Sequence, residues 1–412
     1  MTDYTMRPQT QDFVMDYAPL ILKKNEERRL RAGHLWVFSN EVDSTRTPLP
    51  AFTPGQPVLI TAANGRALGS GYVNPHSLIC ARLMSRDINH PYAPPLVRQR
   101  LLAALALRER LFNRPYYRLV YGEGDGLPGL VVDRYGDILV VQINTAGMDQ
   151  MQGVIIDTLR DCLAPAGILL RNDSAARELE GLPAVVETAS GNVPEEMTIE
   201  ENGCRFVVPM VSGQKTGWFY DHRLNRQRLK ALAPGMRVLD VFSYLGGWGV
   251  QAAVAGAAHV TCVESSPAAV DFIHRNAELN AVGARLETRR GDAFDELRVL
   301  RDEQAQFDLV ILDPPAFIKR KKDMDKGSEA YRLLNQMAMQ LLGPDGMLVT
   351  ASCSSYLGGG DFRNLVRQAA MHSGRFARII EQGHQGPDHP IHPAITETEY
   401  LKLLVLNVLP AQ

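Results

Sequence analysis

Apolar runs and amphipathic stretches alternate along the second half of the chain, from about residue 207 onward. Apolar runs typical of buried parallel strands lie at residues 307–312 and 347–351, and further strand-like runs lie at 237–242, 259–263 and 286–290. Helical patterns fall between such runs, for example at about residues 329–342. Because this alternation favours strands joined by crossover helices, it predicts an α/β domain with a parallel-rich sheet.

The first half of the chain carries two other patterns. Between residues 17 and 86, short β-like runs alternate with turn signals, as in a small barrel or sandwich. A helical stretch at residues 95–112 then leads through the glycine-rich loop 121–129 into two strands within residues 130–143, which predicts an α+β domain. The expected division is a poorly ordered extension at residues 1–16, a β-rich domain at 17–92, a middle domain at 93–206 and the α/β domain at 207–412.

Composition narrows the class of protein. Hydrophobic residues make up 45% of the 412 residues and charged residues 22%, which is ordinary for a globular enzyme. No apolar run approaches the ~18 residues of a membrane span, and the start lacks an apolar signal core, so we expect a cytoplasmic protein without a membrane partner. The five cysteines are odd in number and lack paired spacing, which predicts neither a disulfide framework nor a metal site.

The net charge of −2 does not indicate a nucleic-acid-binding protein, so any such surface must be local. Two basic clusters stand out, at residues 23–31 and 319–326. The first is typical of a solvated face. The second cluster directly follows residues 313–317, a candidate catalytic loop described below. At that place it is expected to position phosphate groups.

Three acids follow successive predicted strands of the α/β domain, where ligands of open sheets bind. Asp240 precedes a turn of small residues, Glu264 suits ribose hydroxyls, and Asp292 suits an adenine amino group. A dinucleotide is the competing ligand, but the G-x-G-x-x-G fingerprint is absent and Asp240 would repel a pyrophosphate. S-adenosylmethionine, with its sulfonium, amino group, ribose and adenine, therefore matches these positions better.

An acid and a thiol end the next two predicted strands. Asp313-Pro314-Pro315-Ala316-Phe317 follows the run at 307–312, and Ser352-Cys353-Ser354 follows the run at 347–351. A thiolate that adds to carbon 6 of cytosine makes carbon 5 nucleophilic, and an acid near ring nitrogen 3 stabilises the adduct. Cys353 and Asp313 are thus the expected catalytic pair for pyrimidine methylation. A buried small hydrophobe is the competing interpretation of Cys353.

The segment at residues 213–226 resembles the G-x-K-T-G-x-F-x-D-x-R-x-N-R signature of the RlmI family. These class I S-adenosylmethionine-dependent methyltransferases make 5-methylcytosine in large-subunit ribosomal RNA, and the resemblance covers nearly the whole chain. Members combine an N-terminal PUA domain, a middle α+β domain and a Rossmann-like catalytic domain. Residues 33–38 and 69–75 resemble the PUA part. The resemblance implies S-adenosylmethionine as cofactor and ribosomal RNA as partner.

The resemblance also implies roles for individual residues. The expected cofactor-binding residues are Asp240, Phe242, Ser243, Gly246, Glu264, Asp292 and Asp313, with Lys215, Phe219, Asp221 and Arg223 of the signature. The expected substrate-binding residues are Pro314, Pro315, Phe317, Lys319, Lys321 and His389.

The signature segment admits two interpretations. Because Phe219, Asp221 and Arg223 share one face of an extended chain, we expect a loop that lies across the cofactor. The alternative is an ordered linker whose charges pair with each other. The three tryptophans, Trp36, Trp218 and Trp248, are expected to pack in the core.

Two other functions stay open at this point. Asp-Pro-Pro-x-Phe resembles the motif of amine-methylating relatives, which polarise a nitrogen through carbonyls and need no thiol. An RNA-binding assembly factor could instead hold S-adenosylmethionine as a structural ligand. The sequence decides neither which cytosine is modified nor whether the chain forms a homodimer.

Overall fold

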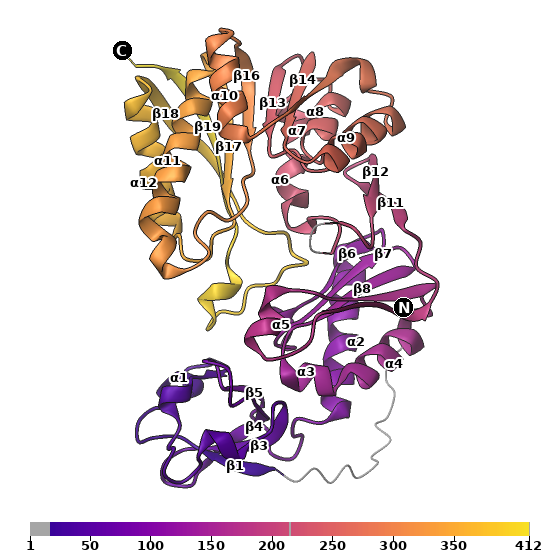
Figure 1. The fold of residues 1–412 in the computed structure, drawn as a ribbon, viewed down its shortest axis with the longest axis vertical. Coiled ribbons are helices and arrows are strands. Elements are labelled where there is room, and N and C mark those ends of the chain that lie inside the picture. Colours follow the sequence, from indigo (N-terminus) through magenta and orange to yellow (C-terminus); the bar gives the residue numbers. More distant parts are fainter. Residues whose placement is uncertain (1–16, 214–215, 412) are drawn as a thin grey trace. The chain divides into compact units, whose positions relative to one another are not determined.

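The computed structural model describes residues 17–213 and 216–411 (Figure 1). The expected extension at residues 1–16 and the signature residue Lys215 lie outside the described residues. The chain divides into two compact units: the first holds the described residues up to Glu195, Thr216 and Asp388–Thr398, and the second holds Glu196–Gly213, Gly217–Pro387 and the chain from Glu399. Across both described stretches, every helix is too short or too polar to cross a membrane.

The first unit begins with a five-stranded sheet of order β1-β3-β4-β5-β2. β1 and β3 are parallel, and the other pairs are antiparallel. Apolar side chains such as Leu20, Val58 and Ile60 form a separate small core beneath it. The β-rich pattern predicted for residues 17–86 is therefore confirmed. The strands are β1 (Ala18–Ile21), β2 (Trp36–Val37), β3 (Gln56–Thr61), β4 (Ala67–Val73) and β5 (Ala81–Ser85).

A second five-stranded sheet, of order β10-β9-β8-β7-β6, follows in the same unit. Its core is built with two long helices, and only the β8–β9 pair is parallel, so the predicted α+β pattern is confirmed. The strands are β6 (Tyr116–Tyr121), β7 (Leu130–Tyr135), β8 (Ile138–Ile143), β9 (Gly167–Asn172) and β10 (Val185–Gly191). The helices of this unit are α1 (Arg28–Arg31), α2 (Pro94–Leu111), α3 (Ala146–Gln150), α4 (Gln152–Leu163) and α5 (Ala175–Leu179).

The second unit contains a seven-stranded sheet of order β15-β14-β13-β16-β17-β19-β18. The first five strands are parallel, as the alternating pattern predicts, and β19 and β18 are antiparallel. β18 escapes prediction because it is an edge strand with mostly exposed side chains. The strands are β13 (Arg237–Val241), β14 (His259–Glu264), β15 (Leu286–Arg290), β16 (Phe307–Leu312), β17 (Leu342–Ser352), β18 (Arg375–Gly383) and β19 (Lys402–Pro410).

Helices cover both faces of this sheet. Leu239 and Val241 of β13 join the core that α10, α11 and α12 form on one face. Asp240 points to the opposite face, where a side chain at Gly249 of α8 would collide with Cys262 of β14. The helices of this unit are α6 (Arg223–Gln227), α7 (Leu229–Leu232), α8 (Gly249–Val254), α9 (Pro267–Leu279), α10 (Ala293–Asp302), α11 (Met324–Gln340) and α12 (Gly359–His372).

A two-stranded hairpin, β11 (Glu196–Glu201) and β12 (Cys204–Pro209), also belongs to the second unit. The side chain of Asn276 in α9 holds β12 through the backbone N–H of Val207, at 2.7 Å. This unit therefore starts before residue 207, the start predicted from the alternating pattern.

The strand order reverses between β13 and β16. The chain runs outward from β13 through β14 to β15, and then returns to place β16 on the other side of β13. In open α/β sheets the loops at the carboxyl ends of such strands diverge and leave a crevice for a ligand. The fold thus points to the ends of β13 and β16 as the place for a site.

Candidate active site

The loop after β13 has an unusual backbone. Phe242 and Tyr244 have φ angles of 67° and 50°, and Gly246 has 81°. Left-handed conformations of bulky residues are uncommon and cluster at functional sites. The loop is held by the backbone N–H groups of Phe242 and Ser243, which both donate to the Val263 carbonyl at 3.1 Å. Three of the predicted loop residues, Phe242, Ser243 and Gly246, therefore lie in one constrained turn.

Asp240 lies buried beneath this turn. One carboxylate oxygen, Oδ2, accepts the backbone N–H of Gly249 at 2.9 Å. The other, Oδ1, is buried and has no hydrogen-bond partner among the described residues. Burial raises the pKa of the Asp240 carboxyl to about 7. A buried carboxylate oxygen without a hydrogen-bond partner can bind a ligand that offers a hydrogen-bond donor or a positive charge.

Glu264 ends the neighbouring strand and borders the same turn. Its carboxylate accepts the backbone N–H of Tyr244 at 2.8 Å and that of Ser266 at 2.9 Å. The side chain is half-buried. Each carboxylate oxygen can accept more than one bond, so these contacts fix the group and leave it able to accept hydroxyl donors.

Asp292 follows β15 and caps α10. Its Oδ1 accepts the backbone N–H groups of Phe294 and Asp295, and its side chain is exposed. Phe294, which the sequence analysis did not single out, has its ring 6.2 Å from that of Phe317. The Phe317 ring in turn lies 6.4 Å from that of Phe242. An apolar floor of three phenylalanines therefore connects the ends of β13, β15 and β16.

Asp313, at the end of β16, is held by two side chains that the sequence analysis gave no role. His222 Nε2 lies 3.1 Å from Oδ1, and Trp248 Nε1 donates to Oδ2 at 2.9 Å. The expectation that Trp248 only packs in the core was incomplete, because its indole N–H also holds this acid. His222 lies inside the signature segment, where a titratable residue between Asp221 and Arg223 was the available signal.

The pKa values of this pair move apart. Burial alone would lower the pKa of His222, but the Asp313 carboxylate and their hydrogen bond raise it above its ordinary value. Burial alone would raise the pKa of Asp313, but His222 and the two hydrogen bonds hold it below its ordinary value. The arrangement therefore favours an imidazolium beside a carboxylate.

The signature segment is helical from Tyr220 onward, which corrects the extended chain predicted for Phe219, Asp221 and Arg223. Residues Tyr220–His222 form a 3-10 turn and α6 follows at Arg223, so alternate residues do not share a face. The reason is a buried anchor: Glu201 accepts two hydrogen bonds from Arg226, at 2.6 and 3.0 Å, and one from Trp218 Nε1, at 3.0 Å. Burial opposes the charge of Glu201, yet Arg226 keeps its pKa below the ordinary value.

The predicted site residues of this segment accordingly make contacts with different parts of the second unit. The Phe219 ring lies 5.4 Å from that of Tyr244, beside the turn after β13. Asp221 is buried and accepts the hydroxyl of Tyr400. Arg223 lies 3.7 Å from Glu201 of β11, which is outside the signature segment.

Cys353 follows β17, next to the loop that Asp313 begins. Its Sγ lies 3.9 Å from the Pro314 carbonyl oxygen. The neighbouring Ser354 ties the two loops together, because its Oγ accepts the Ile318 N–H at 3.2 Å and bonds the Tyr331 hydroxyl at 2.9 Å. The structure thus brings the acid-bearing loop and the thiol to one edge of the sheet.

The predicted substrate-binding residues do not all lie in the same unit of the structure. Pro314 is buried and Pro315 is exposed, and Lys319 and Lys321 are exposed just beyond them. His389 belongs to the first unit, where it is buried, lies 3.0 Å from Asp388 Oδ1 and packs 5.2 Å from the Tyr121 ring. The structure therefore does not join His389 to Asp313 and Cys353 within one unit.

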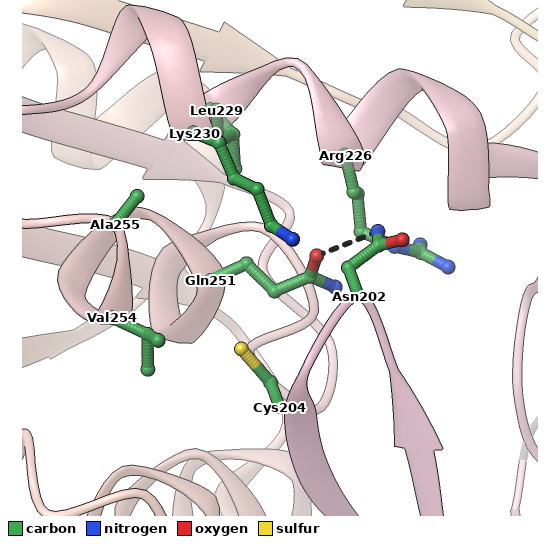
Figure 2. A pocket seen from close by; sticks show the side chains of 8 residues that line it. All are labelled: Asn202, Cys204, Arg226, Leu229, Lys230, Gln251, Val254 and Ala255. Carbon is green, nitrogen blue, oxygen red and sulfur yellow. Dashed lines mark hydrogen bonds between the residues drawn. The ribbon is translucent and has the colours of Figure 1, made fainter.

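A pocket of about 250 Å³ lies elsewhere on the second unit, between the β11–β12 hairpin and helices α6 to α8 (Figure 2). Lys230, Gln251 and the thiol of Cys204 face it, and burial raises the pKa of that thiol to about 11. Asn202 donates to Gln251 across its wall at 2.9 Å. None of the predicted site residues lines this pocket, and within the described chain no group of three or more His, Cys, Asp or Glu could hold a metal ion.

Comparisons with known proteins identify two families along the chain. Residues 20–86 match the family model of a PUA-like domain, and residues 149–403 match that of S-adenosylmethionine-dependent methyltransferases. The chain is 36% identical over 395 residues to "Ribosomal RNA large subunit methyltransferase I" of Erwinia tasmaniensis, covering 95% of this chain and 99% of that protein. It is 34% identical to the protein of the same name from Salmonella arizonae, covering 97% and 100%.

Solved structures share the fold. A putative SAM-dependent methyltransferase from Streptococcus mutans superposes with a TM-score of 0.81, at 21% identity, over 95% of this chain and 100% of that one. A putative methyltransferase complexed with SAH superposes with a TM-score of 0.82, at the same identity and coverage.

Proposed function

Because the chain belongs to the family of the ribosomal RNA large subunit methyltransferase I proteins, which are S-adenosylmethionine-dependent methyltransferases, we propose that it methylates carbon 5 of a cytosine in large-subunit ribosomal RNA. The reaction would proceed through a covalent adduct between Cys353 and the cytosine. The names of the relatives support the RNA substrate, and the PUA-like domain at residues 20–86 supports RNA binding.

The single observation that carries this proposal is the place of the thiol. Cys353 Sγ lies 3.9 Å from the Pro314 carbonyl, beside the loop that begins with Asp313. Methylation of an amine requires carbonyls that polarise a nitrogen but no thiol, whereas carbon 5 of a pyrimidine needs a nucleophile at carbon 6. A thiol at this position therefore favours the pyrimidine.

In the proposed reaction, the Cys353 thiolate forms a bond with carbon 6 of the cytosine. Electron density moves toward ring nitrogen 3 and carbon 5, so that carbon 5 becomes the nucleophile that accepts the methyl group. Solvent water then takes the proton from carbon 5, the electrons of that C–H bond re-form the double bond between carbons 5 and 6, and the bond between carbon 6 and sulfur breaks to release the thiolate. This sequence divides one difficult substitution into easier steps.

Asp313 and His222 would supply the hydrogen bond to ring nitrogen 3. The imidazolium of His222 holds a proton 3.1 Å from the Asp313 carboxylate. When the ring becomes an adduct, nitrogen 3 becomes more basic, and a proton that passes from His222 to Asp313 allows the acid to donate a hydrogen bond to it. Trp248 keeps the carboxylate in orientation through Oδ2.

S-adenosylmethionine supplies an electrophilic methyl group on a sulfonium when it is bound. Asp240 fits its positive charge, since Oδ1 is buried and lacks a partner among the described residues. Glu264 would accept its ribose hydroxyls, and the turn at Phe242, Ser243 and Gly246 would border its methionine part. Asp292 would receive the adenine amino group with the oxygen that does not cap α10.

Residues of the catalytic loop would hold the RNA. Pro315 and Phe317 follow Asp313 directly, and Lys319 and Lys321 add exposed positive charge for phosphates. Phe219, beside Tyr244, would cover the cofactor side of the same region. Arg223 and Asp221 would support this arrangement through Glu201 and Tyr400. Lys215 is proposed from the signature, and His389 from its place in a loop that precedes the last strand.

The proposal is tested by incubating the protein with labelled S-adenosylmethionine and protein-free large-subunit ribosomal RNA, followed by nucleoside mass spectrometry. Cys353→Ala is compared with Cys162→Ala, a matched change at a half-buried cysteine of the middle domain. We expect 5-methylcytidine from the wild type and from Cys162→Ala, and a rate lower by ~10⁴ or more for Cys353→Ala. A methylated purine, or equal product from Cys353→Ala, would favour amine methylation.

A further inference from the structure

Lys402 is the first residue of β19, and its side chain reaches the loop that carries Cys353. In the antiparallel pair of β17 and β19, Lys402 lies opposite Ser352, the residue before the cysteine. Its Nζ donates to the Ser354 carbonyl at 2.6 Å and to the Tyr400 carbonyl at 2.8 Å. The ammonium group is therefore fixed beside the thiol-bearing turn by two backbone acceptors.

An ammonium group has three donors, and these two carbonyls use two of them. Within residues 17–213 and 216–411, no third acceptor for Lys402 is present, and the side chain is half-buried. One N–H of a partly desolvated cation is thus available next to Cys353.

The charged neighbours of this cation are few. Burial lowers the pKa of Lys402 to about 8, while the thiolate of Cys353 and the carboxylate of Glu399 oppose that effect. Tyr331 of α11 also faces the thiol, but burial raises the pKa of its hydroxyl, so it stays neutral and bonds Ser354. Lys402 is therefore a cation that interacts with Cys353, and it is still charged at neutral pH.

We propose that Lys402 is a positioning residue that holds the sulfur of Cys353 as a thiolate. A thiolate beside a partly buried ammonium is favoured over the thiol, which lowers its pKa and increases its reactivity at neutral pH. This inference rests on the proposed function, in which the thiolate is the nucleophile. A merely structural Lys402 would instead join the turn to β19 without changing the titration of the sulfur.

The test measures the thiol and needs neither RNA nor cofactor. The full-length protein is treated with iodoacetamide at a series of pH values from about 6 to 10, and the alkylation rate of Cys353 is followed by peptide mass spectrometry. Wild type is compared with Lys402→Arg, which keeps a cation, and with Lys402→Gln, a neutral side chain that can still donate to a carbonyl. Cys162 serves as an internal reference in every sample, because it is half-buried and belongs to the other unit.

We expect Lys402→Gln to react about tenfold more slowly than wild type at neutral pH and equally fast near pH 10, since one unit of pKa is a tenfold change in thiolate. Lys402→Arg should keep most of the wild-type rate. An unchanged pH profile in Lys402→Gln, with Cys162 also unchanged, would overturn the inference. A loss of methylation without a change in this profile would count against Lys402 and leave the proposed function intact.

Discussion

His222 Nε2 lies 3.1 Å from Asp313 Oδ1, and the two residues come from segments far apart in the chain. This pair joins the signature segment to the end of β16, where the catalytic loop begins. Its charge state therefore couples the local fold to pH.

The pair should make stability depend on pH in a definite window. The pKa of His222 is raised by folding, so its contribution is complete below its unfolded value of about 6.5 and is lost as the pH rises through the folded value. The pKa of Asp313 is lowered, so its contribution is present above about 3.9 and is lost as the pH falls through the folded value. The benefit should be greatest between about pH 4 and 6.5.

The check is urea unfolding of wild type and His222→Asn across this range. We expect the loss of unfolding free energy in the variant to be about 1–3 kcal/mol near pH 5 and to shrink as the pH rises through the raised pKa of His222. His274→Asn, at a histidine on the exposed side of α9, is the matched control and should show no such trend. A loss of equal size at every pH would mean that the pair is not charged.

Glu264→Gln should weaken cofactor binding. The amide has one accepting oxygen in place of two, so it can keep only one of the hydrogen bonds from the backbone N–H groups of Tyr244 and Ser266, and it lacks the charge. We therefore expect a loss of roughly 1–3 kcal/mol in the binding free energy of S-adenosylmethionine. Titration calorimetry measures this directly. Glu287→Gln, at an acid of β15 bonded to Thr261, is the control and should bind as wild type does. Equal affinities for both variants would remove Glu264 from the site.

The exposed lysines beyond the catalytic loop should contribute phosphate contacts. Replacement of Lys319, Lys321 and Lys322 by Ala should weaken RNA binding and reduce the slope of log K against log salt by as much as about 2 to 3, since each lost phosphate contact removes about 0.9 for a duplex and 0.7 for a single strand. The control is the double variant Lys23→Ala with Lys24→Ala in the other basic cluster, which removes two positive charges where the first variant removes three. An identical slope in the first variant would make that cluster ordinary surface.

Glu201 should be essential to the fold of the signature segment. It is buried and bonded to Arg226, Trp218 and Gln251, so Glu201→Ala leaves a buried guanidinium without its counter-charge. We expect a loss of about 3–5 kcal/mol in unfolding free energy, measured by urea denaturation. Glu200→Ala, at the neighbouring residue of β11, should cost far less, and similar losses in both would contradict the role of the anchor.

Much of the fold follows from the sequence because β13, β14, β16 and β17 are largely buried and their apolar runs are easily recognised. The same runs place Asp240, Asp313 and Cys353 at strand ends, and parallel strands bring such ends to one edge. β18 could not be found in this way, since Arg375, Arg378 and Glu381 interrupt its apolar residues and most of its side chains are exposed.

The partners of the site residues were harder to predict. His222, Trp248 and Lys402 act through contacts between distant segments, and no local pattern distinguishes them from ordinary polar or core residues. Residues Phe219, Asp221 and Arg223 were assigned an extended form because alternate spacing suggested one face, but the chain is helical from Tyr220 onward, where Arg226 bonds the buried Glu201. Tertiary contacts here override the local pattern.

The central claim, a covalent bond between Cys353 and cytosine, can be tested by trapping the adduct. Large-subunit RNA containing 5-fluorocytidine is incubated with the protein and S-adenosylmethionine, because fluorine at carbon 5 cannot leave as a proton and the thiolate is then not released. The account predicts a protein–RNA species that survives denaturing electrophoresis and maps by mass spectrometry to the peptide that contains Cys353. Methylation of unmodified RNA at carbon 5 without any trapped species, or a species attached through another residue, would contradict it.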